Sequence, residues 1–221
     1  MALPAITPYD LPAARDLPAA RAPWQPQLPR LALLVHDMQN YFCRPFNAAA
    51  PLPRVIDHVA ALLAAARAAG VPVFYTAQQG DQFRPDRGLQ ADLWGPGMQA
   101  IPEHQDILPE LAPRSGDIVL VKHRYSAFQR SNLASLMRAR GRDQLLICGV
   151  YAHIGCLATA LEAFQRDIQP FAVADAQADF SRRDLDMAMT WIAATCGVAL
   201  TTAAALEALR AGPGGEDAAC N

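Results

Sequence analysis

The chain has 221 residues, of which 52% are hydrophobic and 18% are charged, and its formal net charge is −2. A chain of this length can bury about 70% of the surface that it exposes when unfolded, which is enough for one domain with a single core. The slight negative charge provides no basic field for a phosphate backbone and argues against a nucleic-acid partner.

The sequence also argues against secretion and membrane insertion. The N-terminus lacks the charged start and continuous apolar core of a signal peptide, and no apolar run reaches the ~18 residues of a membrane span. Three of the five cysteines, Cys148, Cys156 and Cys196, lie in apolar segments, as is typical of reduced thiols. We therefore expect a cytoplasmic protein without disulfides.

The two ends of the chain differ from its middle. Residues 1–30 contain seven prolines, which exclude a regular helix or a central strand. The leucines of this segment and Trp24 indicate an arm that lies over the surface. Residues 212–221 are expected to form a flexible tail, so the folded domain is expected to span residues 31–211.

Strand-like and helix-like segments alternate through this domain. Short apolar runs predict strands at residues 31–36, 71–77, 117–122, 144–150, 169–174 and 198–202. Helical periodicity predicts helices at residues 53–69, from about 131, at 156–166, after the capping sequence Ser181-Arg-Arg-Asp184, and at the end of the domain. The alternation predicts an α/β fold of three layers, α/β/α, with a six-stranded, mostly parallel sheet.

Residues 78–102 interrupt this alternation. The segment holds Gly80, Gly88, Gly95 and Gly97 and is far longer than the usual connection of about 2–6 residues between a strand and a helix. We expect an irregular segment that serves as a lid or binding loop.

Polar side chains follow three of the predicted strands. Asp37 follows the first, Gln78 the second and Lys122 comes at the end of the third. The carboxyl ends of parallel strands meet at one edge of a sheet, where open α/β folds bind their ligands. A catalytic acid is one interpretation of Asp37; a helix cap or a structural ion pair with Lys122 are the others.

Several segments carry a resemblance to a known family. These are LLVHDMQNYF, YTAQQG, RGL followed by DLWGPGM, VKHRYSAF, and GRDQLLICGVYAHIGCLATALEAFQRDIQPFAVADAQADFS. Together they resemble the isochorismatases of siderophore and phenazine pathways along nearly the whole chain. The resemblance implies a Rossmann-like hydrolase fold and hydrolysis of the enolpyruvyl vinyl ether of isochorismate or 2-amino-2-deoxyisochorismate to pyruvate and a dihydrocyclohexadiene acid. It implies no metal and no organic cofactor.

The same resemblance implies roles for individual residues. The family's general acid corresponds to Asp37 and its partner lysine to Lys122. The wider superfamily of cysteine hydrolases carries its nucleophile at the position of Gly155, one residue before Cys156. Because one helical residue turns a side chain by about 100°, Cys156 is expected to be a structural thiol, and Gly155 to leave space and a backbone N–H for an anion.

Substrate binding follows from the resemblance and from charge. The implied substrate is a chorismate-derived dicarboxylate, for which Arg87 is the expected clamp, although a solvated loop charge is the alternative. Gln78 and Tyr151 are expected to donate further hydrogen bonds. Phe42 and Trp94 are expected to form apolar walls.

The chain departs from its relatives in some details. His123 stands where many relatives carry Trp, and Gln79 where they often carry Pro, so the packing of the pocket is expected to differ. We expect no aryl carrier domain after the hydrolase domain. Relatives form symmetric assemblies, so we expect a homodimer. A cysteine-dependent amidase using Cys156 and a non-catalytic scaffold are the alternative functions.

The implied chemistry makes a demand on Asp37. Protonation of the terminal methylene of a vinyl ether requires an acid, whereas a free aspartate has a pKa near 3.9 and is ionised at neutral pH. Lys122 alone lowers the pKa of its partner further. We therefore expect the dianionic substrate to occupy Lys122 and to raise the pKa of Asp37 in the complex.

Overall fold

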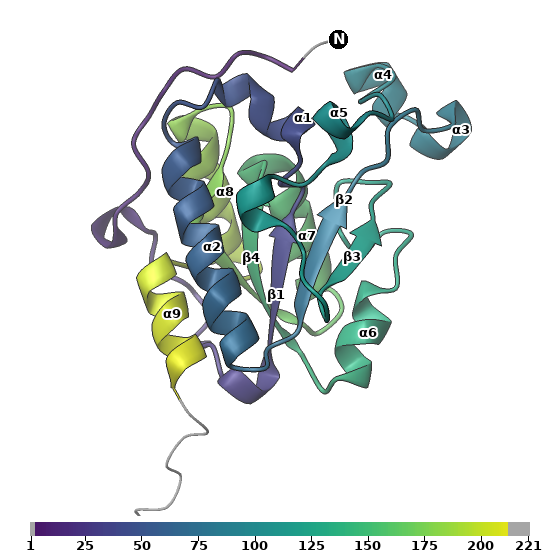
Figure 1. Cartoon of the computed structure of the whole chain (residues 1–221). Helices are drawn as coiled ribbons and strands as arrows, with labels where there is room; N and C mark the ends of the chain where they lie inside the picture. Colours follow the sequence, from purple (N-terminus) through teal and green to yellow (C-terminus); the bar gives the residue numbers. More distant parts are fainter. Residues whose placement is uncertain (1–2, 212–221) are drawn as a thin grey trace, which may run out of the picture.

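The structure is a computed structural model that describes residues 3–211 (Figure 1). The expected tail, residues 212–221, lies outside the described residues. Six parallel strands form one sheet in the order β3-β2-β1-β4-β5-β6. The strands are β1 (Leu31–His36), β2 (Val73–Ala77), β3 (Ile118–Val121), β4 (Gln144–Val150), β5 (Gln169–Ala178) and β6 (Val198–Leu200).

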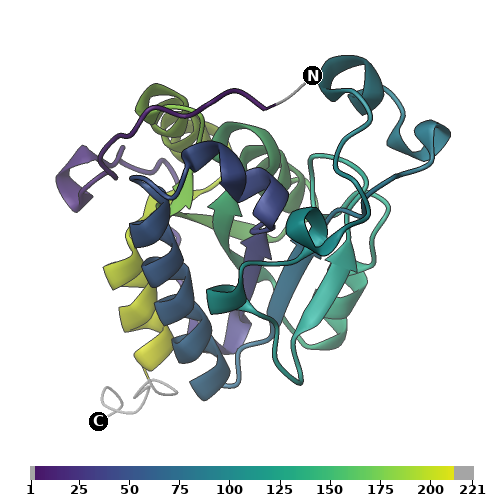
Figure 2. The same ribbon diagram turned by 45° about the horizontal axis from the view of Figure 1, so that its top comes forward.

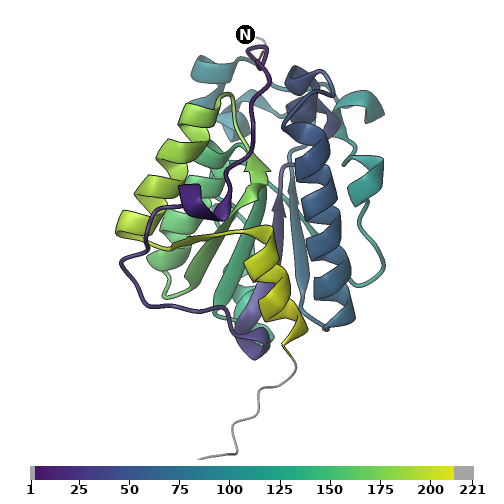
Figure 3. The same cartoon turned by 90° about the vertical axis from the view of Figure 1, so that its left-hand side faces the viewer.

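Helices cover both faces of the sheet, as Figure 3 shows with the sheet between two helical layers. One layer holds α2 (Leu52–Ala68) and α9 (Thr202–Arg210), which pack on each other and on β5. The other holds α6 (Leu133–Ala139), α7 (Leu157–Phe164) and α8 (Arg182–Thr195). The α/β/α prediction is thereby confirmed.

Burial on both faces explains why the central strands carry no alternation of polar and apolar residues. Every residue of β1 and β4 is buried. Leu33 and Val35 pack against the α2 layer, whereas Ala32 and Leu34 pack against the α7 layer. Two separate apolar cores, one on each face, therefore hold β1 in place.

The boundaries of some elements differ from the sequence prediction. β2 begins at Val73, after Pro72, which has no N–H to donate to a sheet ladder. β5 continues to Ala178 beyond a register shift opposite Ile147 and Gly149. A π-helical turn (Ala152–Cys156) precedes α7, so the predicted helix there starts in an irregular turn.

The long segment after β2 is less irregular than predicted. Three short helices form within or next to it: α3 (Arg84–Arg87), α4 (Gln90–Trp94) and α5 (Pro102–Gln105). The glycines Gly88 and Gly95 end α3 and α4 with positive φ angles of 57° and 67°. The prediction of an irregular stretch was wrong for α3 and α4, because each glycine stops a helix after one turn without preventing it.

The proline-rich arm crosses the molecule beside the carboxyl edge of the sheet (Figure 2). Ile6 is buried in the core of the α2 layer, and its N–H donates to the Pro45 carbonyl at 3.1 Å. The Tyr9 hydroxyl donates to the Asp179 carbonyl at 3.0 Å and accepts from the Asp179 N–H at 2.8 Å. The arm is therefore tied to the domain at the end of β5.

The edge strand β3 is partly exposed. Val119 and Val121 of edge strand β3 are 47% and 41% exposed, so the apolar pattern there does not reflect burial on both faces. Within the described part of the chain, no helix is both long enough and apolar enough to cross a membrane.

Candidate active site

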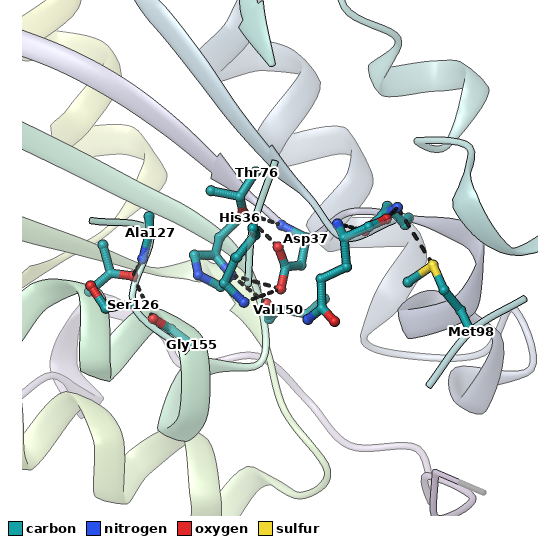
Figure 4. A network of polar contacts seen from close by, with 12 residues as sticks. His36, Asp37, Thr76, Met98, Ser126, Ala127, Val150 and Gly155 are labelled. Carbon is teal, nitrogen blue, oxygen red and sulfur yellow. Dashed lines mark hydrogen bonds and ion pairs between the residues drawn. The ribbon is translucent and has the colours of Figure 1, made fainter. Parts of the chain in front are cut away.

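Asp37 lies directly after β1, where the strand order reverses between β1 and β4. Its backbone has a positive φ of 51°, which turns the chain sharply out of the sheet. Its Oδ2 accepts from the Lys122 ammonium at 2.6 Å and its Oδ1 from the Thr76 hydroxyl at 2.6 Å. Both oxygens of the carboxylate are thus held by donors at the ends of β2 and β3, and Figure 4 shows Thr76 beside Asp37.

The electrostatics of this pair favour an ionised Asp37 in the free protein. Only 5% of its side chain and 3% of that of Lys122 are exposed. Burial alone raises the pKa of Asp37, but the Lys122 charge and the hydrogen bonds from Lys122 and Thr76 hold it below its ordinary value of 3.8. Protonation of Asp37 at neutral pH therefore requires a further negative charge nearby that raises its pKa.

A single pocket brings the predicted site residues together. Its lining contains all eight of them: Asp37, Phe42, Gln78, Arg87, Trp94, Lys122, Tyr151 and Gly155. They come from four separate segments of the chain that the sheet carries to one edge. His123 and Gln79, the two departures from the relatives, are absent from the lining as the structure describes it.

Arg87 is buried, although it belongs to the short helix α3. Its Nε donates to the Gly95 carbonyl at 2.7 Å, and burial lowers its pKa from the ordinary value. A Cβ on Gly97 would lie 2.7 Å from an Arg87 Nη, so a side chain at position 97 would displace the guanidinium. Arg87 is only 6% exposed, which excludes the alternative of a solvated loop charge, and among residues 3–211 no carboxylate forms a salt bridge with it.

The Gln78 peptide is held by a residue that the sequence analysis did not single out. Gln39 is fully buried; its side chain accepts from the Gln78 N–H and donates to the Gln78 carbonyl, each at 2.8 Å. It also donates to the Gln105 carbonyl at 2.7 Å. Gln39 thereby fixes the direction of the Gln78 side chain into the pocket.

Aromatic rings form one wall. Tyr151 packs on Phe180 with ring centroids 4.3 Å apart, and Trp94 lies 6.4 Å from Phe180. The Tyr151 hydroxyl donates to the Phe42 carbonyl at 2.6 Å. The one hydroxyl proton of Tyr151 is thus committed to Phe42 in the free protein, so a hydrogen bond from Tyr151 to substrate stays a prediction, whereas its ring lines the pocket.

Gly155 lines the pocket, but the space that a side chain at this position would take is not open as expected. The imidazole of His36 fills it, with Nδ1 at 2.9 Å from the Val150 carbonyl and 3.7 Å from Asp37 Oδ2. Burial lowers the pKa of His36 to about 4, so the ring is neutral at pH 7. His36 is the last residue of an apolar strand, and a buried polar residue at a strand end was the available signal.

Thr76, Phe180 and Leu3 are among the other contributors that were missed. Thr76 is the last but one residue of β2, and only the parallel register places its hydroxyl on Asp37. Phe180 follows β5, whose length the sequence pattern underestimated. Leu3 of the arm lines the pocket, and nothing in a proline-rich segment indicates which surface it crosses.

None of the four cysteines in residues 3–211 is placed to act as a nucleophile. Cys156 is fully buried, does not line the pocket in the described structure, and burial raises its pKa well above the ordinary value. Cys43, Cys148 and Cys196 are likewise free and buried. Within residues 3–211 no cluster of His, Cys, Asp and Glu offers three ligands to a metal ion.

Comparison with known proteins agrees with this geometry. The family model of the isochorismatase domain matches residues 31–205. The chain is 48% identical to isochorismatase from Bacillus subtilis (strain 168) over 214 residues, which is 96% of this chain and 69% of that protein. It is 49% identical to the phenazine biosynthesis protein PhzD from Pseudomonas fluorescens over 200 residues, which is 90% of this chain and 96% of that protein.

A solved structure shows the same fold. The cysteine hydrolase from Pseudomonas syringae pv. phaseolicola 1448A superimposes with a TM-score of 0.78 and 29% identity, covering 88% of this chain and 98% of that chain. The expected fold class is confirmed by this match. Because the family model and both relatives cover most of its length, the chain belongs to the isochorismatase family.

Proposed function

We propose that this protein hydrolyses the enolpyruvyl vinyl ether of isochorismate or of 2-amino-2-deoxyisochorismate. The products are pyruvate and either 2,3-dihydro-2,3-dihydroxybenzoate or trans-2,3-dihydro-3-hydroxyanthranilate. Relatives named isochorismatase and phenazine biosynthesis protein support these two substrates, which differ in one ring substituent. The reaction serves the biosynthesis of secondary metabolites such as siderophores, phenazines and antibiotics.

The charges of the pocket carry this proposal. Asp37 is the one acid among the described residues that line it, and Arg87 and Lys122 are the two cations. Each of the two substrates has a ring carboxylate and an enolpyruvyl carboxylate. Arg87, which has no acidic partner in the described structure, can clamp one of them through its planar fork, and Lys122 can reach the other.

Substrate binding then changes the state of Asp37. A substrate carboxylate beside Lys122 competes with Asp37 for the ammonium and adds a negative charge near the Asp37 carboxyl. Both effects raise the pKa of Asp37, and burial, which opposes ionisation, acts in the same direction. Asp37 takes up a proton in the complex and becomes a general acid.

Asp37 next protonates the terminal methylene of the vinyl ether, which leaves an oxocarbenium ion. Water adds to the cationic carbon, and Asp37 regains the proton that the water gives up. The resulting hemiketal transfers its hydroxyl proton to the ring oxygen and breaks into pyruvate and the ring alcohol. General acid catalysis of this type supplies about 10² to 10⁴ in rate.

The test measures pyruvate release from each of the two substrates through NADH oxidation by lactate dehydrogenase. We expect release from at least one, and a loss of about 10² to 10⁴ in kcat for Asp37→Asn, which keeps the size of the side chain. Cys156→Ser is the control and retains the parent rate, unlike in a cysteine-dependent amidase. No pyruvate from either substrate, or a near-normal rate for Asp37→Asn, contradicts the proposal.

We further propose that the protein is a cytoplasmic homodimer. The buried, free state of the four described cysteines supports a reducing compartment. The exposed Val119 and Val121 on edge strand β3 support association, because an uncovered apolar edge strand favours pairing with a second copy. Sedimentation of the purified protein tests the assembly, and a monomer at micromolar concentration contradicts it.

A further inference from the structure

The backbone at Gly155 and the side chain of His36 are complementary in shape. A Cβ built on Gly155 would lie 2.1 Å from Cε1 of the His36 ring, 2.9 Å from Nε2 and 3.0 Å from Nδ1. Real Cβ atoms essentially never show contacts under 3.0 Å, so one of the two groups would have to shift. Even the smallest side chain at position 155 therefore points into the imidazole (Figure 4).

Neither partner can move aside easily. The Gly155 carbonyl accepts from the buried Thr159 hydroxyl at 2.7 Å, and that hydroxyl also accepts from the Ala127 N–H at 3.0 Å. His36 belongs to the fully buried strand β1, and its ring is tied to the Val150 carbonyl. The overlap at position 155 has to be resolved by displacing packed backbone or a packed ring.

The ring that blocks a side chain at Gly155 also lies close to the acid. Its Nδ1 carries the proton, because a carbonyl oxygen only accepts, and it lies 3.7 Å from Asp37 Oδ2. Its Nε2 is buried without a partner among the described residues. A side chain at position 155 would extend toward this same place beside Asp37.

We propose that His36 determines the class of chemistry that this site performs: its imidazole takes the room of a side chain at position 155, which keeps a nucleophile out and leaves Asp37 beside Lys122 free for proton transfer. His36 acts as a positioning residue through Gly155 and Asp37 and does not touch the substrate. The spatial half of this inference is that His36 and a side chain at position 155 compete for the same volume. The functional half is that this keeps Asp37 available for proton transfer, and only this half rests on the proposed ether hydrolysis.

The test is a double-mutant cycle of Gly155→Ala and His36→Ala, read by thermal unfolding of the full chain. In the parent, Gly155→Ala overpacks the site and lowers Tm by about 2 to 12 °C. In the His36→Ala background the same methyl group has room, and the loss of Tm falls below half of that value. Equal losses in both backgrounds overturn the proposal, since they show that the two positions do not compete for space.

A matched control uses a second crowded glycine. A Cβ on Gly197 would lie 2.7 Å from the Pro170 carbonyl oxygen and 2.9 Å from Ile192 Cγ2, and His36 is not among its three nearest neighbours. Gly197→Ala is expected to lower Tm by the same amount with and without His36. If Gly155→Ala yields no folded protein, folding of the double variant supports the proposal and failure of the double variant overturns it. Should His36→Ala itself not fold, His36→Val replaces it in the cycle.

A kinetic measurement separates positioning from mere structural support. The new methyl group meets His36 and not the pocket, so Gly155→Ala is expected to lower kcat at least tenfold with KM within threefold of the parent. In the His36→Ala background the same change is expected to lower kcat less than threefold. An equal fold-loss in both backgrounds overturns the functional half. If no substrate releases pyruvate while Tm shows the coupling, the proposed function fails and the spatial half stands.

Discussion

Replacing Lys122 by Met removes one partner of the most buried ion pair in the described structure. The parent Lys122 Nζ lies 2.6 Å from Asp37 Oδ2, with side chains that are 3% and 5% exposed. Removing one member of such a pair leaves an uncompensated charge in the interior and costs about 3 to 5 kcal/mol. For a chain of this size that loss corresponds to a fall in Tm of roughly 6 to 20 °C.

The loss depends on pH in a defined direction. In the parent, the lowered pKa of Asp37 contributes stability above its ordinary value of 3.8, and this contribution disappears as the pH falls through the folded-state pKa. In Lys122→Met, burial raises the pKa of Asp37 above 3.8, so the folded state is penalised at neutral pH and recovers as the pH falls toward 4. The stability gap is therefore widest near pH 7.

Urea unfolding of parent and variant at several pH values between 4 and 7 measures this gap. The double variant Asp37→Asn with Lys122→Met is the control, because it removes both charges and is expected to recover at least half of the loss. A gap below about 1 kcal/mol at pH 7, or a gap that does not change with pH, refutes the reasoning.

Three other outcomes are expected. Arg87→Ala raises KM by about 10- to 100-fold with a smaller fall in kcat, since it removes a charge-assisted clamp; an unchanged KM argues against the clamp. The folded-state pKa of His36, about 4, lies below its ordinary value of 6.5. The free energy of unfolding of the parent is therefore expected to fall by roughly 3 kcal/mol as the pH falls from 6.5 to 4. Urea unfolding of His36→Leu is expected to lack this fall. A parent and variant with the same pH slope contradict the buried neutral ring. Tyr9→Phe lowers the free energy of unfolding by about 1 to 3 kcal/mol, because both Asp179 backbone groups lose their partner, and a change below about 0.3 kcal/mol would show that the arm is not tied there.

Local sequence patterns were sufficient for the framework of the fold. Apolar runs such as β1 and periodic segments such as α2 are detectable from the residues alone, because both faces of the central strands and one face of each helix need apolar side chains. The capping residue Ser181 marks the start of α8 correctly, since its hydroxyl accepts from the Asp184 N–H. Where packing and local pattern disagreed, as in the short helices after β2, the sequence prediction was wrong.

Only part of the candidate site could be predicted from local sequence patterns. Asp37, Gln78 and Lys122 stand at strand ends, so their convergence follows from a parallel sheet. Arg87, Trp94 and Tyr151 came from the resemblance to a family, because single residues in loops carry no local signal of the pocket that they line.

By itself the sequence determined the alternation of strands and helices, the parallel sheet and the acid at its edge, since these depend on periodicity and on neighbours along the chain. Only the tertiary structure decided what surrounds the acid. Thr76 reaches Asp37 through strand register, Gln39 orients Gln78 across a loop, and His36 fills the room beside Gly155. These contacts join residues that are distant in sequence, and no local pattern records which side chains will share the same volume.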